Sequence, residues 1–204
     1  MRIASSRRFQ LALFAAALTL LPLMTAPSAE AQDLHPSRRP SPMGMARTFL
    51  GDTYVRVVYS RPYLRGRDNI FGTEESGALV PFGKVWRTGA NEGTEITVTG
   101  DVKVGDQKLP AGTYTIFTVP GADQWTVHFN SKLGFNGTAL RNRETGQLEP
   151  GFDTANDVVT YTAKPTTLEE PVDQFTISFE DVEGGVHMIL RWNKTEVRVP
   201  ISAA

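Results

Sequence analysis

Short runs in which apolar and polar residues alternate dominate the chain from about residue 48 onward. In residues 125–130, Trp, Val and Phe fall on one face and Thr, His and Asn on the other, which is the period of a half-buried strand. Gly, Pro, Asn and Asp separate these runs, as turns between strands require. The runs predicted as strands are 54–60, 85–88, 95–99, 102–104, 113–119, 125–129, 158–164, 175–180, 186–192 and 196–201.

This pattern predicts an all-β fold. Roughly ten short strands without intervening helices favour antiparallel pairing in a single β-sandwich or jelly-roll-like domain. Residues 109–114, Leu-Pro-Ala-Gly-Thr-Tyr, predict a turn that feeds a strand, with the Tyr114 hydroxyl bonding back to the turn. Residues 131–157 form the one long connection, and we expect an insertion or a lid there.

The first 31 residues predict a cleaved export signal. Arg2, Arg7 and Arg8 give a positive start, residues 11–23 are apolar and uncharged, and Ala-Glu-Ala at 29–31 is a cleavage pattern. The apolar run is shorter than the roughly 20 residues that cross a bilayer. The adjacent pair Arg7-Arg8 leaves both the general and the twin-Arg export routes open.

The remaining chain divides into an arm and a domain. Residues 32–46 contain three Pro and few apolar residues, so we expect an extended or disordered arm. The β-sandwich domain is expected over 47–204, and no transmembrane segment is expected once the signal is cleaved. The mature protein would therefore be soluble in the periplasm or the medium.

Composition excludes several classes of function. The whole chain carries a net charge of −1, which gives it no general attraction for nucleic acid or anionic lipid. It contains no Cys and three His, with no H-x-H or H-E-x-x-H spacing, so we expect no disulfide and no dedicated metal site. A metal site could then form only from distant segments, and the sequence leaves open that Glu92, His128 and Asn130 meet in space.

Known catalytic and cofactor motifs are also missing. Residues 77–85 have five residues between their glycines and Val85 where a phosphate loop has Ser or Thr, so no nucleotide and no other cofactor is expected. There is no G-x-S-x-G elbow. Carboxylates that are adjacent in sequence would point to opposite faces of a strand.

Two polar stretches, 59–67 and 84–92, hold the candidate functional residues. The candidates for ligand binding are Tyr59, Arg61, Arg67, Trp86, Arg87, Asn91 and Glu92. Arg and Asn beside aromatic rings can recognise an anionic or polyhydroxyl ligand. The alternative is internal: Arg61 or Arg87 pairs with Glu92 in a buried polar network, and Trp86 belongs to the core.

The sequence resembles a bacterial secreted family called domain of unknown function 2911. The residues that carry the resemblance are 59–62, Gly66-Arg67, 70–72, 79–92, 109–114 and 125–127, and it covers about 41–201. The resemblance implies a secreted, mostly β domain; the family has no assigned activity, so no catalytic residue is carried over. The chain departs from the family at 73–77 and in the long segment 131–157.

Three functions remain open at this point. The first is an exported binding module for a small anionic or polyhydroxyl envelope ligand, such as a glycan. The second is a small exported hydrolase in which Glu92 acts as general acid or base and Arg87 stabilises developing negative charge. The third is a structural envelope protein without a small-molecule site. They differ in whether Arg87 and Glu92 face a ligand or each other.

Overall fold

The computed structural model describes residues 39–204, which form β-strands joined by turns. The elements are β1 (Met43–Leu50), β2 (Thr53–Ser60), β3 (Phe71–Gly72), β4 (Val80–Pro81), β5 (Thr94–Val98), β6 (Val102–Val104), β7 (Gln107–Leu109), β8 (Gly112–Val119), β9 (Trp125–Asn130), β10 (Ala139–Arg141), β11 (Leu148–Pro150), the 3-10 helix η2 (Thr154–Asn156), β12 (Asp157–Ala163), β13 (Thr166–Val182) and β14 (Gly185–Ala203). The predicted export signal, 1–31, lies outside the described residues.

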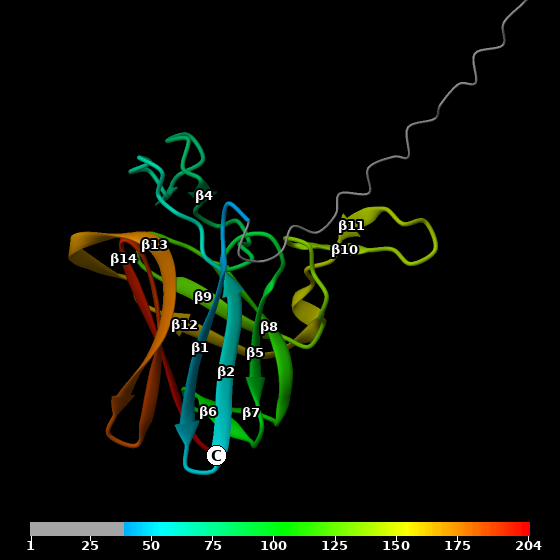
Figure 1. The fold of residues 1–204 in the computed structure, drawn as a ribbon, viewed down its shortest axis with the longest axis vertical. Helices are drawn as coiled ribbons and strands as arrows, with labels where there is room; N and C mark the ends of the chain where they lie inside the picture. Colours follow the sequence, from blue (N-terminus) through cyan, green and yellow to red (C-terminus); the bar gives the residue numbers. More distant parts are fainter. Residues whose placement is uncertain (1–38) are drawn as a thin grey trace, which may run out of the picture. The chain divides into compact units, whose positions relative to one another are not determined.

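The larger sheet has six strands in the order β1-β2-β5-β8-β9-β12, each antiparallel to its neighbours (Figure 1). Its strands keep the alternation seen in the sequence. In β2, Val55 and Val57 are fully buried, whereas Arg56 between them is exposed. One face of this sheet therefore points to the core, and we call the opposite face its outer face.

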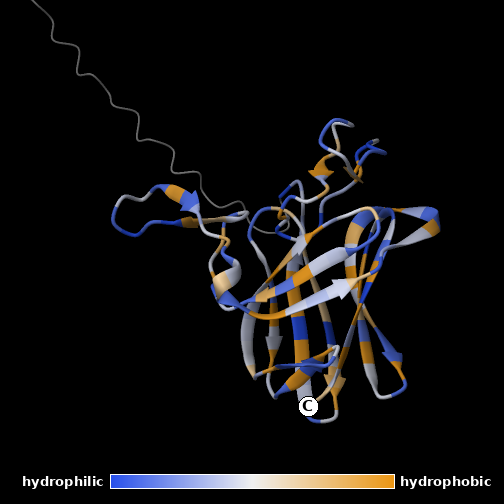
Figure 2. Ribbon diagram, turned by 180° about the vertical axis from the view of Figure 1, so that it is seen from behind, coloured by the Kyte–Doolittle hydropathy of each residue, from blue (hydrophilic) through white to orange (hydrophobic). Residues whose placement is uncertain are grey.

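The smaller sheet has the order β13-β14-β6-β7 and is also antiparallel. Residues from both sheets form one hydrophobic cluster, which includes Val57 and Ile96 from the larger sheet and Ile177 and Val199 from the smaller. Figure 2 shows hydrophobic and hydrophilic residues alternating along the strands. The predicted all-β antiparallel fold is confirmed, as an open β-sandwich rather than a closed barrel.

Aromatic rings fill one part of the core. Trp86 stacks on Trp192 with ring centroids 5.8 Å apart and meets Phe175 edge to face at 5.1 Å. Phe71 contacts both Trp86 and Trp125. Such pairs stabilise beyond the area that they bury, so this cluster fixes the position of the segment that carries Trp86.

The predicted turn at 109–114 is confirmed in its main contact. The Tyr114 hydroxyl donates a hydrogen bond to the carbonyl of Pro110 at 2.9 Å. Burial raises the pKa of Tyr114, and the charge of Asp101 adds to the shift. The turn and the strand β8 are therefore tied together as the tyrosine-corner pattern suggests.

Four of the predicted strands differ clearly from the structure. Residues 175–180 lie within the much longer strand β13, which begins at Thr166. Residues 85–88 form no strand: only Trp86 makes a bridge, to Thr118, and the chain leaves it at Thr88, whose φ of 55° is left-handed. Residues 186–192 and 196–201 form one strand, β14, because the chain passes Asn193 at φ 51° without a turn. Alternation shows which residues face inward, but it does not show single left-handed residues within a run.

The first strand begins inside the segment expected to be an arm. β1 starts at Met43 and pairs with all of β2. The sequence pattern did not predict β1, because the inward-facing positions of this strand include Gly44 and Ala46 rather than large apolar residues. Gly44 is required there, since a Cβ atom would lie 2.4 Å from Cδ of Arg61.

Candidate functional site

The 84–92 segment crosses the end of the core and then turns back beside β2. Trp86 exchanges two backbone hydrogen bonds with Thr118 of β8. Its indole Nε1 donates to the carbonyl of Gly89 at 3.0 Å, and only 7% of the residue is exposed. The structure thus places Trp86 in the core, as the internal alternative expected, and its ring has no open face for stacking.

Tyr59 links the two sheets. Its hydroxyl donates to the carbonyl of Ile177 at 3.1 Å and accepts from the backbone N–H of the same residue at 2.8 Å. Because β13 is an edge strand, these backbone groups have no neighbouring strand to pair with. Burial raises the pKa of Tyr59, although the hydrogen bond to Ile177 and the charge of Arg61 act against the shift.

Arg61 and Arg67 also donate within the chain. Arg61 Nε donates to the carbonyl of Phe175 at 3.1 Å, and its Nη2 donates to Oγ1 of Thr176 at 2.8 Å. Arg67 is exposed and donates to the carbonyl of Tyr63 at 2.8 Å. Arg61 therefore fastens β2 to β13, whereas Arg67 closes a local turn.

Arg87 and Glu92, the pair on which the alternatives depended, do not bond to each other. Arg87 Nη1 donates to the carbonyl of Asn91 at 2.9 Å. Glu92 instead forms an ion pair with Arg39, and its side chain is 51% exposed. The buried network expected for Arg87 and Glu92 is thus not formed.

Asn91 holds the turn in place. It lies in the left-handed region at φ 56°, which Asn tolerates better than most residues. Its side-chain Nδ2 donates to the carbonyl of Ser41 at 3.0 Å and to Oγ of Ser60 at 3.1 Å. Asn91 therefore joins the chain before β1, the end of β2 and the 84–92 segment.

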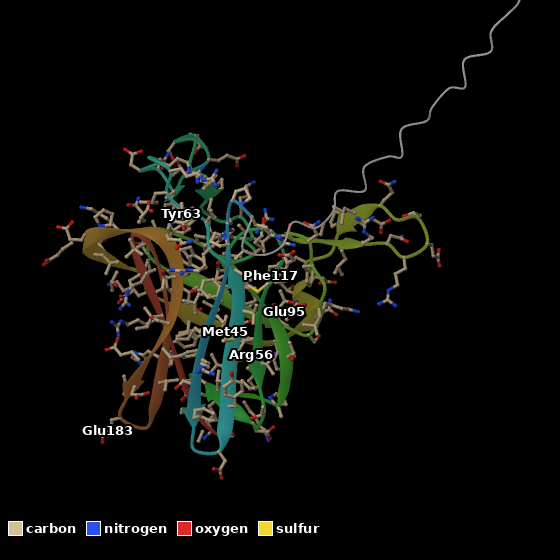
Figure 3. The ribbon with its side chains drawn as sticks, viewed as in Figure 1. Met45, Arg56, Tyr63, Glu95, Phe117 and Glu183 are labelled. Carbon is tan, nitrogen blue, oxygen red and sulfur yellow. The ribbon has the colours of Figure 1, made fainter. Side chains whose placement is uncertain are left out.

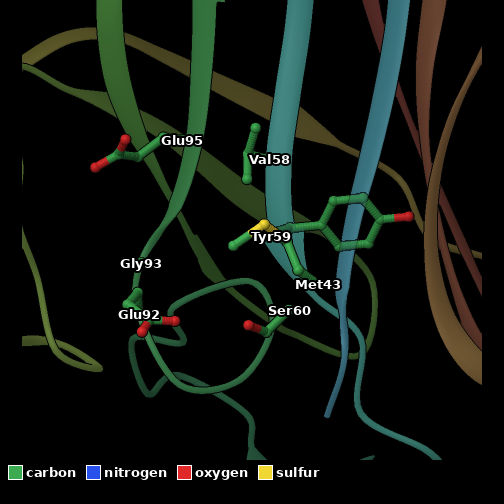
Figure 4. Close-up of a pocket in the computed structure, with 7 residues that line it drawn as sticks. All are labelled: Met43, Val58, Tyr59, Ser60, Glu92, Gly93 and Glu95. Carbon is green, nitrogen blue, oxygen red and sulfur yellow. The ribbon is translucent and has the colours of Figure 1, made fainter. Parts of the chain in front are cut away.

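A cavity of about 210 Å³ opens on the outer face beside this turn (Figure 4). It is lined by Met43, Val58, Tyr59, Ser60, Glu92, Gly93 and Glu95. Three of the predicted site residues are thus at or directly behind the cavity: Glu92 and Tyr59 line it, and Asn91 bonds to Ser60. Arg61, Arg67, Trp86 and Arg87 do not line it.

Sequence reasoning missed the strand residues of this cavity. Val58 and Glu95 are paired neighbours on β2 and β5, and Met43 enters from β1. Figure 3 labels Glu95 on the six-stranded sheet, together with Met45, Arg56 and Phe117. The alternation along β5, in which Thr94 and Ile96 on either side of Glu95 are buried, is the one sequence signal that could have placed Glu95 on the outer face.

The long connection 131–157, which we call the strap, covers another part of the outer face. Phe135 and Phe152 of the strap pack edge to face on Phe117, at 4.8 and 4.9 Å between ring centroids. Two backbone hydrogen bonds join it to the turn: Gly137 N–H to Asn91 O at 3.0 Å, and Gly93 N–H to Phe135 O at 3.1 Å. The strap and the 84–92 segment, far apart in sequence, therefore meet.

A buried polar cluster lies under the strap. His128 Nδ1 and Asp157 Oδ2 are 2.7 Å apart, and Asn130 Nδ2 donates to Asp157 Oδ1 at 2.8 Å. His128 and Asn130 thus meet at Asp157, and Glu92 is not part of the cluster. Among the described residues, no group of three or more His, Cys, Asp or Glu side chains is arranged to hold a metal ion.

The part of the chain that the structure describes contains no helix long and apolar enough to cross a membrane. A family model described as "Protein of unknown function (DUF2911)" matches residues 41–201. No curated protein and no solved structure matches the chain significantly. The match covers the cavity, the turn and the strap.

Proposed function

The chain belongs to the DUF2911 family of proteins of unknown function, and we propose that it is an exported binding module for a small polyhydroxyl ligand. The observation that carries the proposal is the outer-face cavity, where apolar side chains and carboxylates meet. Small-molecule sites are typically concave and mostly apolar, with a few polar groups that fix orientation.

The cavity has two kinds of wall. Met43 and Val58 supply apolar surface, against which the C–H face of a sugar ring can be buried. Glu92, Glu95 and the Ser60 hydroxyl supply oxygen atoms, and ionised carboxylates only accept hydrogen bonds. Hydroxyl groups donate such bonds, so a ligand with one apolar face and several hydroxyls matches both walls.

The charges at the cavity favour a polyhydroxyl ligand over an anionic one. Its charged lining residues, Glu92 and Glu95, are both acidic. Arg61 donates to the backbone and side chain of β13 instead, and Arg39 is paired with Glu92. A carboxylate or phosphate in this cavity would face like charges.

The size of the cavity limits the ligand. Pockets that bind drug-sized ligands measure roughly 300 to 1,000 Å³, whereas this cavity measures about 210 Å³. A single sugar ring or the end of a glycan chain fits better than an extended oligosaccharide. Such an end could come from an envelope glycan or from a free sugar.

Export is part of the proposal because residues 1–31 have the three parts of a signal sequence. N-terminal sequencing of the protein from fractionated cells should begin at Gln32, in the fraction outside the cytosol. A chain that stays in the cytosol with residues 1–31 attached would contradict this part.

The ligand is tested by a thermal-shift screen of the mature chain against monosaccharides, peptidoglycan fragments, organic acids and amines. We expect neutral sugars or glycan ends to raise Tm by binding in the cavity, and we expect organic acids not to bind there. Glu95→Gln should weaken the shift, because it replaces a charged acceptor with a neutral amide. Glu170→Gln, an exposed carboxylate on β13, is the matched control. If no sugar binds, or if Glu95→Gln changes nothing, the proposal fails.

A further inference from the structure

Arg87 is less well partnered within the protein than the half-buried arginines Arg61 and Arg191. Arg191 is paired with Glu196, and Arg61 uses two of its nitrogen atoms as donors to β13. For Arg87 the structure gives one hydrogen bond, from Nη1 to the carbonyl of Asn91. Within residues 39–204, no carboxylate lies at ion-pair distance from it.

Arg87 is a half-buried cation with no carboxylate partner in the described residues. A guanidinium group has five N–H donors and no acceptor, and no Arg87 nitrogen is both fully buried and without a hydrogen-bond partner, so its remaining donors are open to water or to a ligand. Burial lowers the pKa of Arg87, with no opposing charge to reverse the effect. Glu92, five residues along the chain, does not compensate because it pairs with Arg39.

The position of Arg87 is nevertheless closely defined. The guanidinium lies against Gly137 of the strap, where a Cβ atom would be 3.1 Å from Nη1 and 3.3 Å from Cζ. The carbonyl of Asn91 accepts hydrogen bonds both from Arg87 and from Gly137 N–H. The charged group is therefore held at the seam between the turn and the strap, with Nε and Nη2 left for another acceptor.

We propose that Arg87 binds a small oxyanion, a carboxylate or a phosphate, at the seam between the 84–92 segment and the strap. The planar fork of an arginine pairs with two oxygens of such a group at once. This site is separate from the polyhydroxyl cavity, since Arg87 is not among the residues that line it. The inference therefore stands whether or not the cavity binds a sugar.

The test uses the mature chain and measures Tm in sodium phosphate, in sodium acetate and in sodium chloride at matched ionic strength. We expect phosphate or acetate to raise Tm above the chloride value in a saturable way, because a ligand that binds only the folded state stabilises it. The same shift in all three salts would mean general screening only and would overturn the proposal. Which of the two oxyanions acts at the lower concentration tells phosphate from carboxylate.

Arg87→Gln removes the charge and keeps an amide that can donate to Asn91 O. It should abolish the oxyanion shift, whereas Arg67→Gln, at an exposed arginine that also donates to one carbonyl, should keep it. Arg87→Lys keeps the charge without the fork and should bind at least about threefold more weakly. An unchanged shift in Arg87→Gln would overturn the proposal.

If Arg87→Gln does not fold, phosphate binding by the folded wild-type and Arg87→Lys chains decides the question. Phosphorus NMR of inorganic phosphate should show line broadening that is strong with wild type and weaker with Arg87→Lys. Equal broadening by the two chains would overturn the proposal, as would no broadening by wild type together with no rise of Tm in acetate.

Discussion

Glu92 forms its ion pair with Arg39, at the chain's approach to β1, and not with Arg87. Arg87 bonds to the backbone of Asn91 and lies under the strap. The sequence suggested a single site that contains both Arg87 and Glu92, but the structure places the two side chains at different positions. Glu92 borders a cavity on the outer face, and Arg87 occupies the seam next to it. The polyhydroxyl and the anionic ligand chemistries are accordingly proposed for different positions.

Tyr59→Phe should destabilise the protein, although it removes only one oxygen atom. The hydroxyl satisfies both the N–H and the carbonyl of Ile177 at the edge of β13, and leaving a buried backbone group unpaired costs about 1 to 3 kcal/mol. Urea unfolding followed by circular dichroism measures the loss. Tyr54→Phe, at a half-buried tyrosine on the same strand, should cost much less; equal losses would show that the sheet-to-sheet bond has no special role.

Gly137→Ala should be more damaging than Gly146→Ala. Both glycines have φ 70°, so both substitutions carry the same backbone strain, but only at 137 does the new Cβ meet a neighbour, Arg87. We expect an extra loss of up to about 1 kcal/mol at 137, because the guanidinium end of Arg87 has to move by a few tenths of an ångström, together with faster proteolysis in the strap. Paired urea titrations measure the difference. If the two variants unfold at the same denaturant concentration, the strap does not depend on its contact with Arg87.

Asp157→Ala should loosen the strap. The carboxylate is the partner of His128 Nδ1 and of Asn130 Nδ2 in a buried cluster, and losing hydrogen bonds to a buried charge costs about 2 kcal/mol or more. Asp153→Ala removes the side-chain cap of η2, which is exposed, and should cost about 1 kcal/mol. Denaturant unfolding and limited trypsin digestion follow both effects. A larger loss for Asp153→Ala would contradict the assigned role of Asp157.

Glu196 should stabilise the folded protein at neutral pH and lose this effect in acid. Burial by itself would raise the pKa of Glu196, but hydrogen bonds and charge from Arg198 and Arg191 outweigh it and the pKa lies below its ordinary value of 4.5. A lowered pKa in the folded state stabilises the protein above the unfolded value, and this contribution is lost as the pH falls through the folded value. Urea midpoints at pH 7 and pH 3 should therefore differ less in Glu196→Gln than in wild type. Equal changes with pH in both chains would exclude this contribution.

Much of the fold could be predicted from the sequence because alternation records which face of a strand is buried. Trp125, Val127 and Phe129 lie in the core as expected, and His128 lies on the other face. The burial of His128 could not be predicted, because the strap that covers it is contributed by a later part of the chain. Periodicity within one strand carries no information about what packs on its outer face.

The candidate site was predictable only in part, for a similar reason. The 84–92 segment was identified by its dense polar and aromatic content, and Glu92 does border the cavity. The other walls come from β1, β2 and β5, whose residues Met43, Val58 and Glu95 have no unusual sequence context. Their meeting depends on strand order and register, which arise from long-range pairing rather than from local sequence.

The central claim is that the cavity beside Glu92 binds a small polyhydroxyl ligand. Its most direct test fills the cavity, because Val58→Trp places an indole on the wall formed by β2. The control, Val158→Trp, makes the same change at an exposed position on β12, the edge strand on the opposite side of the sheet from β1. Titration calorimetry with the best sugar from the screen measures both variants. We expect Val158→Trp to bind like wild type and Val58→Trp to bind at least tenfold more weakly, a loss of about 1.4 kcal/mol or more. Unchanged binding in Val58→Trp would contradict the claim.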